Sequence, residues 1–146
     1  MLAGTLDLAG FDTTIASLAG GGSVLLGSGT LTIGTTSGST GFFGEISGSG
    51  GVTKVGDSTQ VFSGAQTYTG LTQIDGGYLV VFDGSLAGSV LNNAGFSLGG
   101  ITGSRLFGGL TNTSTGFAEM FGQVDGAVQN DGRLTSLGLT TYLSRI

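Results

Sequence analysis

The sequence predicts an all-β fold in which short parallel strands stack as a β-solenoid of roughly six rungs. Three observations predict it: Gly, Ser and Thr make up close to half of the 146 residues, apolar residues alternate within short runs, and short units recur along the chain. Strands of this length cannot bury a core alone, but stacking completes their backbone hydrogen bonds. At about 22 residues per coil, the chain makes roughly six rungs.

The composition excludes other architectures. The chain has 32 Gly and no Pro. Long helices are disfavoured because each Gly costs about 1 kcal/mol relative to Ala in a helix. A mean hydropathy of +0.37, with 38% hydrophobic residues, opposes disorder. A collagen triple helix is excluded as well, because it requires Pro and a Gly at every third residue, and the chain has neither feature.

The composition also limits the chemistry. The absence of Cys and His removes disulfides, thiolate metal sites and the commonest general base. A net charge of −5 with four cations opposes nucleic-acid binding. The longest apolar run, Tyr78–Phe82, is too short for a signal peptide or a membrane helix.

Glycine, often beside Ser or Asp, separates the expected strands. Within the better strands, apolar residues alternate with polar ones, as period two requires. The expected strands are, in order, residues 5–8, 15–18, 24–26, 30–33, 42–46, 52–55, 61–62, 67–69, 72–74, 78–82, 90–91, 96–98, 106–107, 124, 128–129 and 134–137.

Two units recur. The first, residues 4–8, returns at 29–33 and more loosely at 77–81, and predicts stacked inward side chains at Leu6, Leu8, Leu31, Ile33, Leu79 and Val81. The second, residues 22–26, returns at 88–93 and 126–131. Asn92-Asn93 and Asn130-Asp131 in this second unit suit corners, because Asn and Asp tolerate left-handed backbone.

One segment departs from the strand pattern. Phe117, Met120 and Phe121 lie at helical spacing between two glycines. We therefore expect an irregular excursion or a single helical turn at residues 117–121.

Residues 48–56, 62–72 and 77–81 resemble the passenger-associated strand repeat of bacterial autotransporters. The family pattern is a glycine-rich turn, apolar-x-Lys-x-Gly with Lys54 at the lysine position, Ser-Gly-x-Asn-Thr-Tyr-Thr-Gly, and Gly-x-Leu. Residues 4–18 also resemble what precedes that repeat, so the likeness covers about residues 4–82. Gln66 departs from the usual Asn, and Leu71 from the usual Gly.

The resemblance implies a right-handed parallel β-helix, secreted through type V secretion and displayed on the bacterial surface by an outer-membrane translocator that this chain lacks. It implies one β-helical passenger segment over residues 1–146, with residues 83–146 as further, less regular rungs. The function expected is a structural or adhesive surface module without catalytic activity, cofactor or metal. Its expected partners are further rungs or neighbouring copies at the open ends, and a host or cell-surface ligand, but not nucleic acid or membrane.

Two alternatives stay open. A carbohydrate-active β-helix would place at least two carboxylates on one outward groove of neighbouring rungs; the candidates are Asp57, Asp75, Asp83, Asp125 and Asp131, most of which precede Gly in turn-like pairs. The other alternative is a self-assembling solenoid filament subunit. Without His, only Lys54 could activate a serine, and no positioned partner is evident.

Other sites have weaker support. The chain has no tandem Gly-Gly-x-Gly-x-Asp units for calcium. Thr-x-Thr occurs at Thr30–Thr32 and Thr67–Thr69, which is too few for an ice-binding array. A membrane β-barrel is also disfavoured, because its strands need about 9–11 residues and the expected strands are shorter.

A lateral contact surface is expected at Tyr78, Val80 and Phe82. If Leu79 and Val81 point inward, period two sends these three side chains outward. An exposed apolar row usually marks a contact with another module or subunit. The alternative is a β-bulge that turns Phe82 back into the core.

Overall fold

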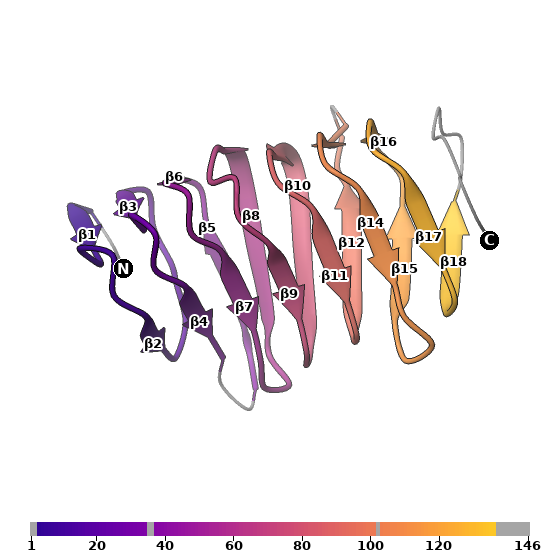
Figure 1. Ribbon diagram of the computed structural model, residues 1–146, viewed down its shortest axis with the longest axis horizontal. Helices are drawn as coiled ribbons and strands as arrows, with labels where there is room; N and C mark the ends of the chain where they lie inside the picture. The colour runs from indigo at the N-terminus through magenta and orange to yellow at the C-terminus, as the bar shows by residue number, and fades with distance from the viewer. Residues whose placement is uncertain (1–2, 35–36, 102, 137–146) are drawn as a thin grey trace.

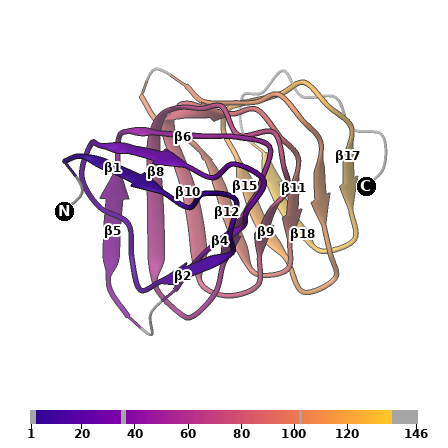
Figure 2. The same cartoon turned by 60° about the vertical axis from the view of Figure 1, so that its left-hand side comes forward.

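The structure, a computed structural model, describes residues 3–34, 37–101 and 103–136. All regular elements in these ranges are β-strands, and the chain coils into about seven turns stacked along one axis (Figure 1). Figure 2, turned so that the N-terminal coils come forward, shows successive turns around a common interior. The described residues include no helix that could span a membrane.

A seven-stranded parallel sheet runs along one face of the coil (Figure 1). Its strands, in spatial order, are β2 (Thr13–Ile15), β4 (Leu31–Ile33), β7 (Val52–Lys54), β9 (Thr72–Ile74), β11 (Val90–Asn92), β14 (Leu110–Asn112) and β17 (Val128–Asn130). Pairing joins Leu31 to Val52, Val52 to Thr72, and Thr72 to Val90, so these turns take 21, 20 and 18 residues. Turns shorter than the expected 22 residues explain why about seven fit.

The other faces carry an eight-stranded and a three-stranded parallel sheet. The eight-stranded sheet contains β5 (Ser39–Phe42), β8 (Thr59–Gln66), β10 (Tyr78–Leu86), β12 (Gly95–Gly99), β13 (Arg105–Leu106), β15 (Phe117–Met120), β16 (Gln123–Val124) and β18 (Arg133–Ser136). The three-stranded sheet contains β1 (Thr5–Asp7), β3 (Ser23–Leu25) and β6 (Glu45–Ser47). The long strand β10 pairs with β12 in its first half and with β13 in its second.

The core fills the inside of the coil with columns of apolar side chains. Of the predicted inward residues, Leu8, Leu31, Ile33, Leu79 and Val81 are buried, and Leu6 is half-buried against the core. The copies of the first repeat lie in different sheets, so they do not stack on one another. Each stacks on strands one turn away, as Leu79 does on Phe96.

The second repeat is confirmed on one face only. Its copies in β11 and β17 lie in the seven-stranded sheet, separated by β14, so they stand two turns apart. Asn92 and Asn130 are not at left-handed corners, because they end these strands with buried side chains.

A buried asparagine ladder therefore replaces the expected corners. The Asn92 amide donates to Oδ1 of Asn112 at 2.8 Å, and the Asn112 amide donates to Oδ1 of Asn130 at 2.7 Å. The three residues pair in register on adjacent strands.

Residues 117–121 are not a helical turn. Residues 117–120 form β15, with Ala118 and Met120 buried and Phe117 and Glu119 half-buried on the outer side. Pairing with β12 and β18 on both sides satisfies the backbone of β15, which decides against an isolated helical turn.

Several other strand bounds differ from the prediction. The strand expected at 15–18 lies at 13–15, the one at 42–46 is divided between β5 and β6, residues 67–69 form a corner, and β14 was not predicted. The end of the strand expected at 134–137 lies outside the described residues. The remaining strands are shifted by a few residues or are longer than expected. Backbone pairing between neighbouring turns continues past the apolar residues into the glycine corners, and this extends the strands.

The buried side chain of Lys54 forms hydrogen bonds with the backbone at two corners of the coil. Its Nζ atom donates to the carbonyl oxygen of Val55 at 2.6 Å and reaches that of Gly76, one turn on, at 3.4 Å. Burial lowers the pKa of Lys54, and the nearby Asp57 carboxylate opposes this shift.

This lysine is expected to make stability depend on pH. Between the lowered folded-state pKa and the usual value of 10.5, the unfolded chain binds more protons than the folded chain, so the Lys54 contribution makes stability rise with pH. Burial raises the pKa of Tyr68, which reverses the trend above pH 10. Urea unfolding from pH 7 to 10 should show the rise, and Lys54→Met should flatten it. An equal rise in the variant would assign the effect to other groups.

Candidate functional surface

Strand alternation builds columns of outward side chains on the seven-stranded sheet. The middle residue of each strand points outward between two inward neighbours. From β2 to β17 this column reads Thr14, Thr32, Thr53, Gln73, Leu91, Thr111 and Gln129. Gln73 and Leu91 interrupt its threonines, so the column is not a continuous hydroxyl array.

A groove runs beside this column, along the coil axis. Its bed comes from small residues immediately before the strands, among them Gly51, Ser89 and Gly109. One hollow of about 450 Å³ spans β9 to β17, and another of about 300 Å³ lies beside it, toward the N-terminus. Leu71 lines both hollows, so the two form one interrupted groove.

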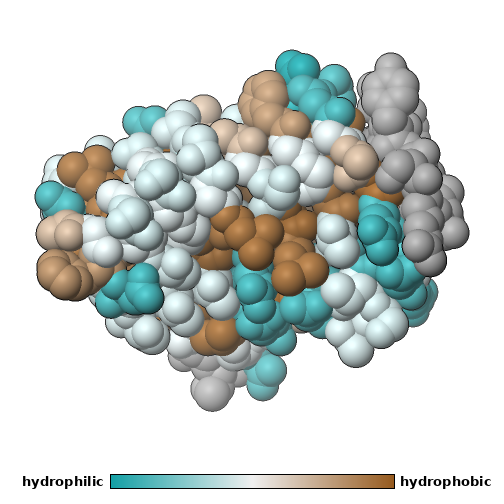
Figure 3. All heavy atoms as spheres, in the orientation of Figure 1, coloured by the Kyte–Doolittle hydropathy of each residue, from teal (hydrophilic) through white to brown (hydrophobic). Residues whose placement is uncertain are grey.

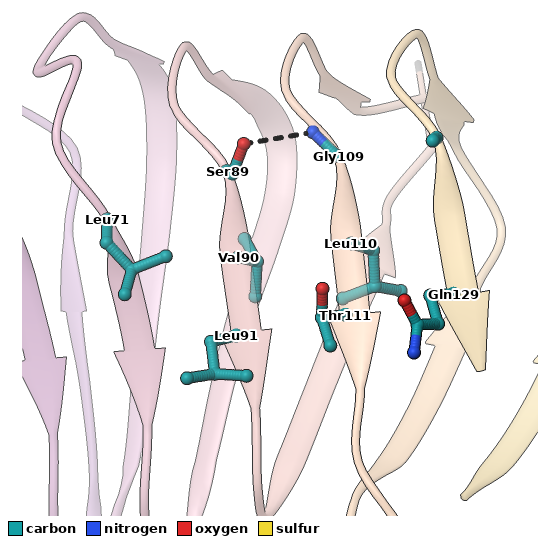
Figure 4. A pocket seen from close by; sticks show the side chains of 9 residues that line it. Leu71, Ser89, Val90, Leu91, Gly109, Leu110, Thr111 and Gln129 are labelled. Carbon is teal, nitrogen blue, oxygen red and sulfur yellow. Dashed lines mark hydrogen bonds between the residues drawn. The ribbon is translucent and has the colours of Figure 1, made fainter. Parts of the chain in front are cut away.

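The groove is apolar at its centre and is lined by polar residues on its sides. Figure 3 shows an apolar patch in the middle of this face, next to pale and hydrophilic residues. In Figure 4, Leu71 lies just before β9 and Leu91 lies on the neighbouring strand β11, with Thr111 and Gln129 farther along the same face. Leu71 is 45% exposed.

A polar chain borders the far side of the central column. Gln73 and Asn93 both donate to the Asp75 carboxylate, at 3.0 and 2.9 Å, and the Thr113 hydroxyl donates to Oδ1 of Asn93 at 2.9 Å. The sequence predicts Asp75 as a turn residue and as one candidate carboxylate of the carbohydrate-active alternative. The structure shows that its carboxylate also joins side chains from two turns.

The predicted lateral row lies on the outer face of the eight-stranded sheet. Leu79 and Val81 are buried, Tyr78 and Val80 are half-buried, and Phe82 is 43% exposed, which is the outward register. A register shift does follow Val81, with left-handed backbone at Asp83, but it does not turn Phe82 into the core.

Neighbouring coils of the same chain partly cover this row. A Cβ atom at Gly95 would lie 2.5 Å from the Tyr78 ring, so the absence of a side chain there makes room for the ring. Beyond Gly95, Tyr78 meets Phe117 edge to face, with ring centroids 6.3 Å apart. Arg133, one turn farther on, lies over the Phe117 ring.

A second aromatic pair flanks Gly99 on the same sheet. Phe82 pairs in register with Gly99, and Phe121 packs over Gly99 from the next turn. Phe121 is 41% exposed. The helical spacing of Phe117 and Phe121 in the sequence hides their part in this surface. The glycines opposite Tyr78 and Phe82 are the signal that could have found it.

Two of the candidate carboxylates, Asp75 and Asp131, stand too far apart for the pair that the glycosidase alternative requires. In the column beside the groove, Asp75 and Asp131 are separated by Asn93 and Thr113, so they stand about 14 Å apart at ~4.8 Å per turn. Paired catalytic carboxyl groups stand within about 9.5 Å. The described residues hold no group of three or more acidic side chains suited to a metal.

Asp125 is engaged in a surface ion pair. Its carboxylate accepts from Arg105, whose guanidinium also lies over the Phe107 ring. The hydrogen bond from Arg105 lowers the pKa of Asp125, so this carboxyl is not poised as a general acid.

Comparisons with known proteins agree with the resemblance. Residues 52–81 match the passenger-associated-transport-repeat family. The chain is 54% identical over 80 residues to the adhesin BmaC autotransporter of Brucella suis biovar 1 (strain 1330), an alignment that covers 51% of this chain and 2% of that protein. No solved structure matches the chain.

These matches confirm the predicted likeness and support a location at the bacterial cell surface, attached through a separate translocator domain. The chain spans only a small part of its relative, so the activity of the whole protein is not transferred with the match. The coil carries the repeat over β7, β8, β9 and the start of β10. The chain is a β-solenoid that carries a passenger-associated-transport-repeat over residues 52–81 and is similar in sequence to an autotransporter adhesin.

Proposed function

We propose that the chain is a structural and adhesive module of the bacterial surface, without catalytic activity of its own. The observation that carries the proposal is a parallel coil whose outward side chains stack in columns along its axis, in a chain similar to an autotransporter adhesin. Parallel stacking holds these columns in fixed register, and extended surfaces are what repeat proteins use for binding.

Adhesion is tested with the purified chain on beads. Coated beads should attach to epithelial cells more than beads coated with the Leu31→Asp variant, which should not fold. Equal attachment of the two bead types would contradict the adhesive role.

Catalysis is tested on the same material. No polysaccharide in a panel should release new reducing ends. Release that a single Asp→Asn substitution abolishes would favour the carbohydrate-active alternative instead.

The proposal includes contacts with further rungs or neighbouring copies. The row of Tyr78, Val80 and Phe82 is proposed to meet a loop of the same protein or a second copy, because Phe82 is exposed at its end and Tyr78 and Val80 are only half-buried. A second mode of assembly, separate from this lateral contact, is proposed at the ends of the coil. There, further rungs or other copies pair with the end strands, since unpaired strand edges template additional strands.

Val80→Lys is expected to weaken a lateral contact and leave the coil folded, because Val80 lies outward between two buried residues. Light scattering should show smaller assemblies, with unchanged circular dichroism. If assemblies persist at the same size, the lateral route is contradicted and end-to-end pairing is favoured.

A further inference from the structure

The groove on the seven-stranded sheet has the shape of a site for a linear ligand. Its two hollows follow one another along the coil axis, over successive turns spaced ~4.8 Å apart. The lining residues therefore repeat at a nearly constant interval. A chain molecule lying along the axis would meet similar groups at each step.

Unpaired hydroxyl groups line this path. Within the described part of the chain, the hydroxyls of Thr30, Thr53 and Thr111 make no hydrogen bond to protein. Each can both donate and accept. Gln73 and Gln129 use their amide NH₂ groups on neighbouring aspartates, which directs their carbonyl oxygens to other donors.

The apolar component is small and placed between the hydroxyl groups. Leu71 lies just before β9 and Leu91 lies in the central column on β11, and beyond Leu91 that column continues with Thr111 and Gln129 (Figure 4). Two leucines do not suffice for the apolar face of an amphipathic helix, which presents anchors over several turns. They suit the C–H face of a sugar ring.

The charge on this face excludes anionic ligands. The hollows have no charged residue in their lining. Asp75 and Asp131 border them, while Arg105 and Arg133 belong to strands of the eight-stranded sheet. An acidic polysaccharide would be repelled here and would find no basic partner.

An extended peptide is also disfavoured. Peptides that add to a sheet need a free strand edge, but β9, β11 and β14 are each paired on both sides. A glycan needs no such edge, because its hydroxyls bond to side chains.

We propose that this groove binds a linear, uncharged glycan of the surface to which the module adheres. The inference rests on the proposed adhesive function and gives it a ligand class. Hydroxyl edges of the sugar units would meet the threonines and glutamines, and their C–H faces would pack on Leu71 and Leu91.

The test uses the intact chain and defined oligosaccharides. Calorimetry with cellohexaose, laminarihexaose and maltohexaose should detect binding of at least one, and a heparin hexasaccharide should not bind. The variant Leu71→Ser/Leu91→Ser should weaken binding at least about tenfold. The matched control, Phe43→Ser/Ile101→Ser, removes exposed apolar side chains that lie outside the seven-stranded sheet and should bind as the parent does.

The outcomes separate the ligand from the function. Failure of all three uncharged glycans, preference for heparin, or equal weakening by the control variant would overturn the glycan site. If glycans fail while coated beads still attach to cells, adhesion stands with another ligand. Failure of the beads to attach would overturn the proposed function itself.

Discussion

Replacement of Leu31 with Asp is expected to unfold the coil. Leu31 is fully buried, between Thr13 and Val52 on the adjacent strands. Loss of a buried leucine alone costs about 2–5 kcal/mol. The carboxylate adds the cost of burying an unpaired charge, and together these costs approach the 5–15 kcal/mol by which domains are typically stable.

Circular dichroism and urea unfolding measure this effect. The matched control is Thr32→Asp, because Thr32 is the next residue of the same strand and points outward. The control should stay folded and lose little stability. A folded Leu31→Asp protein, or equal damage from both variants, would contradict the inward register of β4.

Replacement of Asn112 with Leu is the second large effect. The side chain is fully buried and occupies the middle of the asparagine ladder, and its amide also donates to the carbonyl oxygen of Arg133 at 3.0 Å. A leucine of similar size leaves the facing polar groups of Asn92 and Asn130 without these bonds. Each unsatisfied buried group costs about 1–3 kcal/mol, so we expect a loss of roughly 3 kcal/mol or more.

The urea midpoint should fall accordingly. Thr111→Leu, one residue earlier and outward-facing, is the control and should change the midpoint little. If Asn112→Leu were as stable as the parent chain, the ladder would be energetically dispensable.

Local sequence pattern predicts the inward and outward registers of the clearest strands. Leu31 and Ile33 flank the polar Thr32, so period two assigns their faces, and the recurrence of this unit at residues 77–81 carries the same assignment to Leu79 and Val81. The outward position of Val80 follows from the same rule.

Pairing between turns decides what local pattern misses. The segment at Phe117 has helical spacing, yet β12 and β18 on either side hold it as a strand. Asn112 has no special local context, because its role depends on asparagines one turn before and one turn after it. The groove escaped sequence analysis for the same reason, since its bed comes from small residues on successive turns.

The most direct test of the account is the register between turns, on which every proposed surface depends. The chain has no cysteine, so introduced pairs report cleanly. Thr53 and Gln73 are register partners on β7 and β9, and Thr53→Cys/Gln73→Cys should form a disulfide under mild oxidation. Thr32→Cys/Gln73→Cys, two turns apart at about 10 Å, should not. Crosslinking of the second pair, or failure of the first in a folded protein, would contradict the parallel coil.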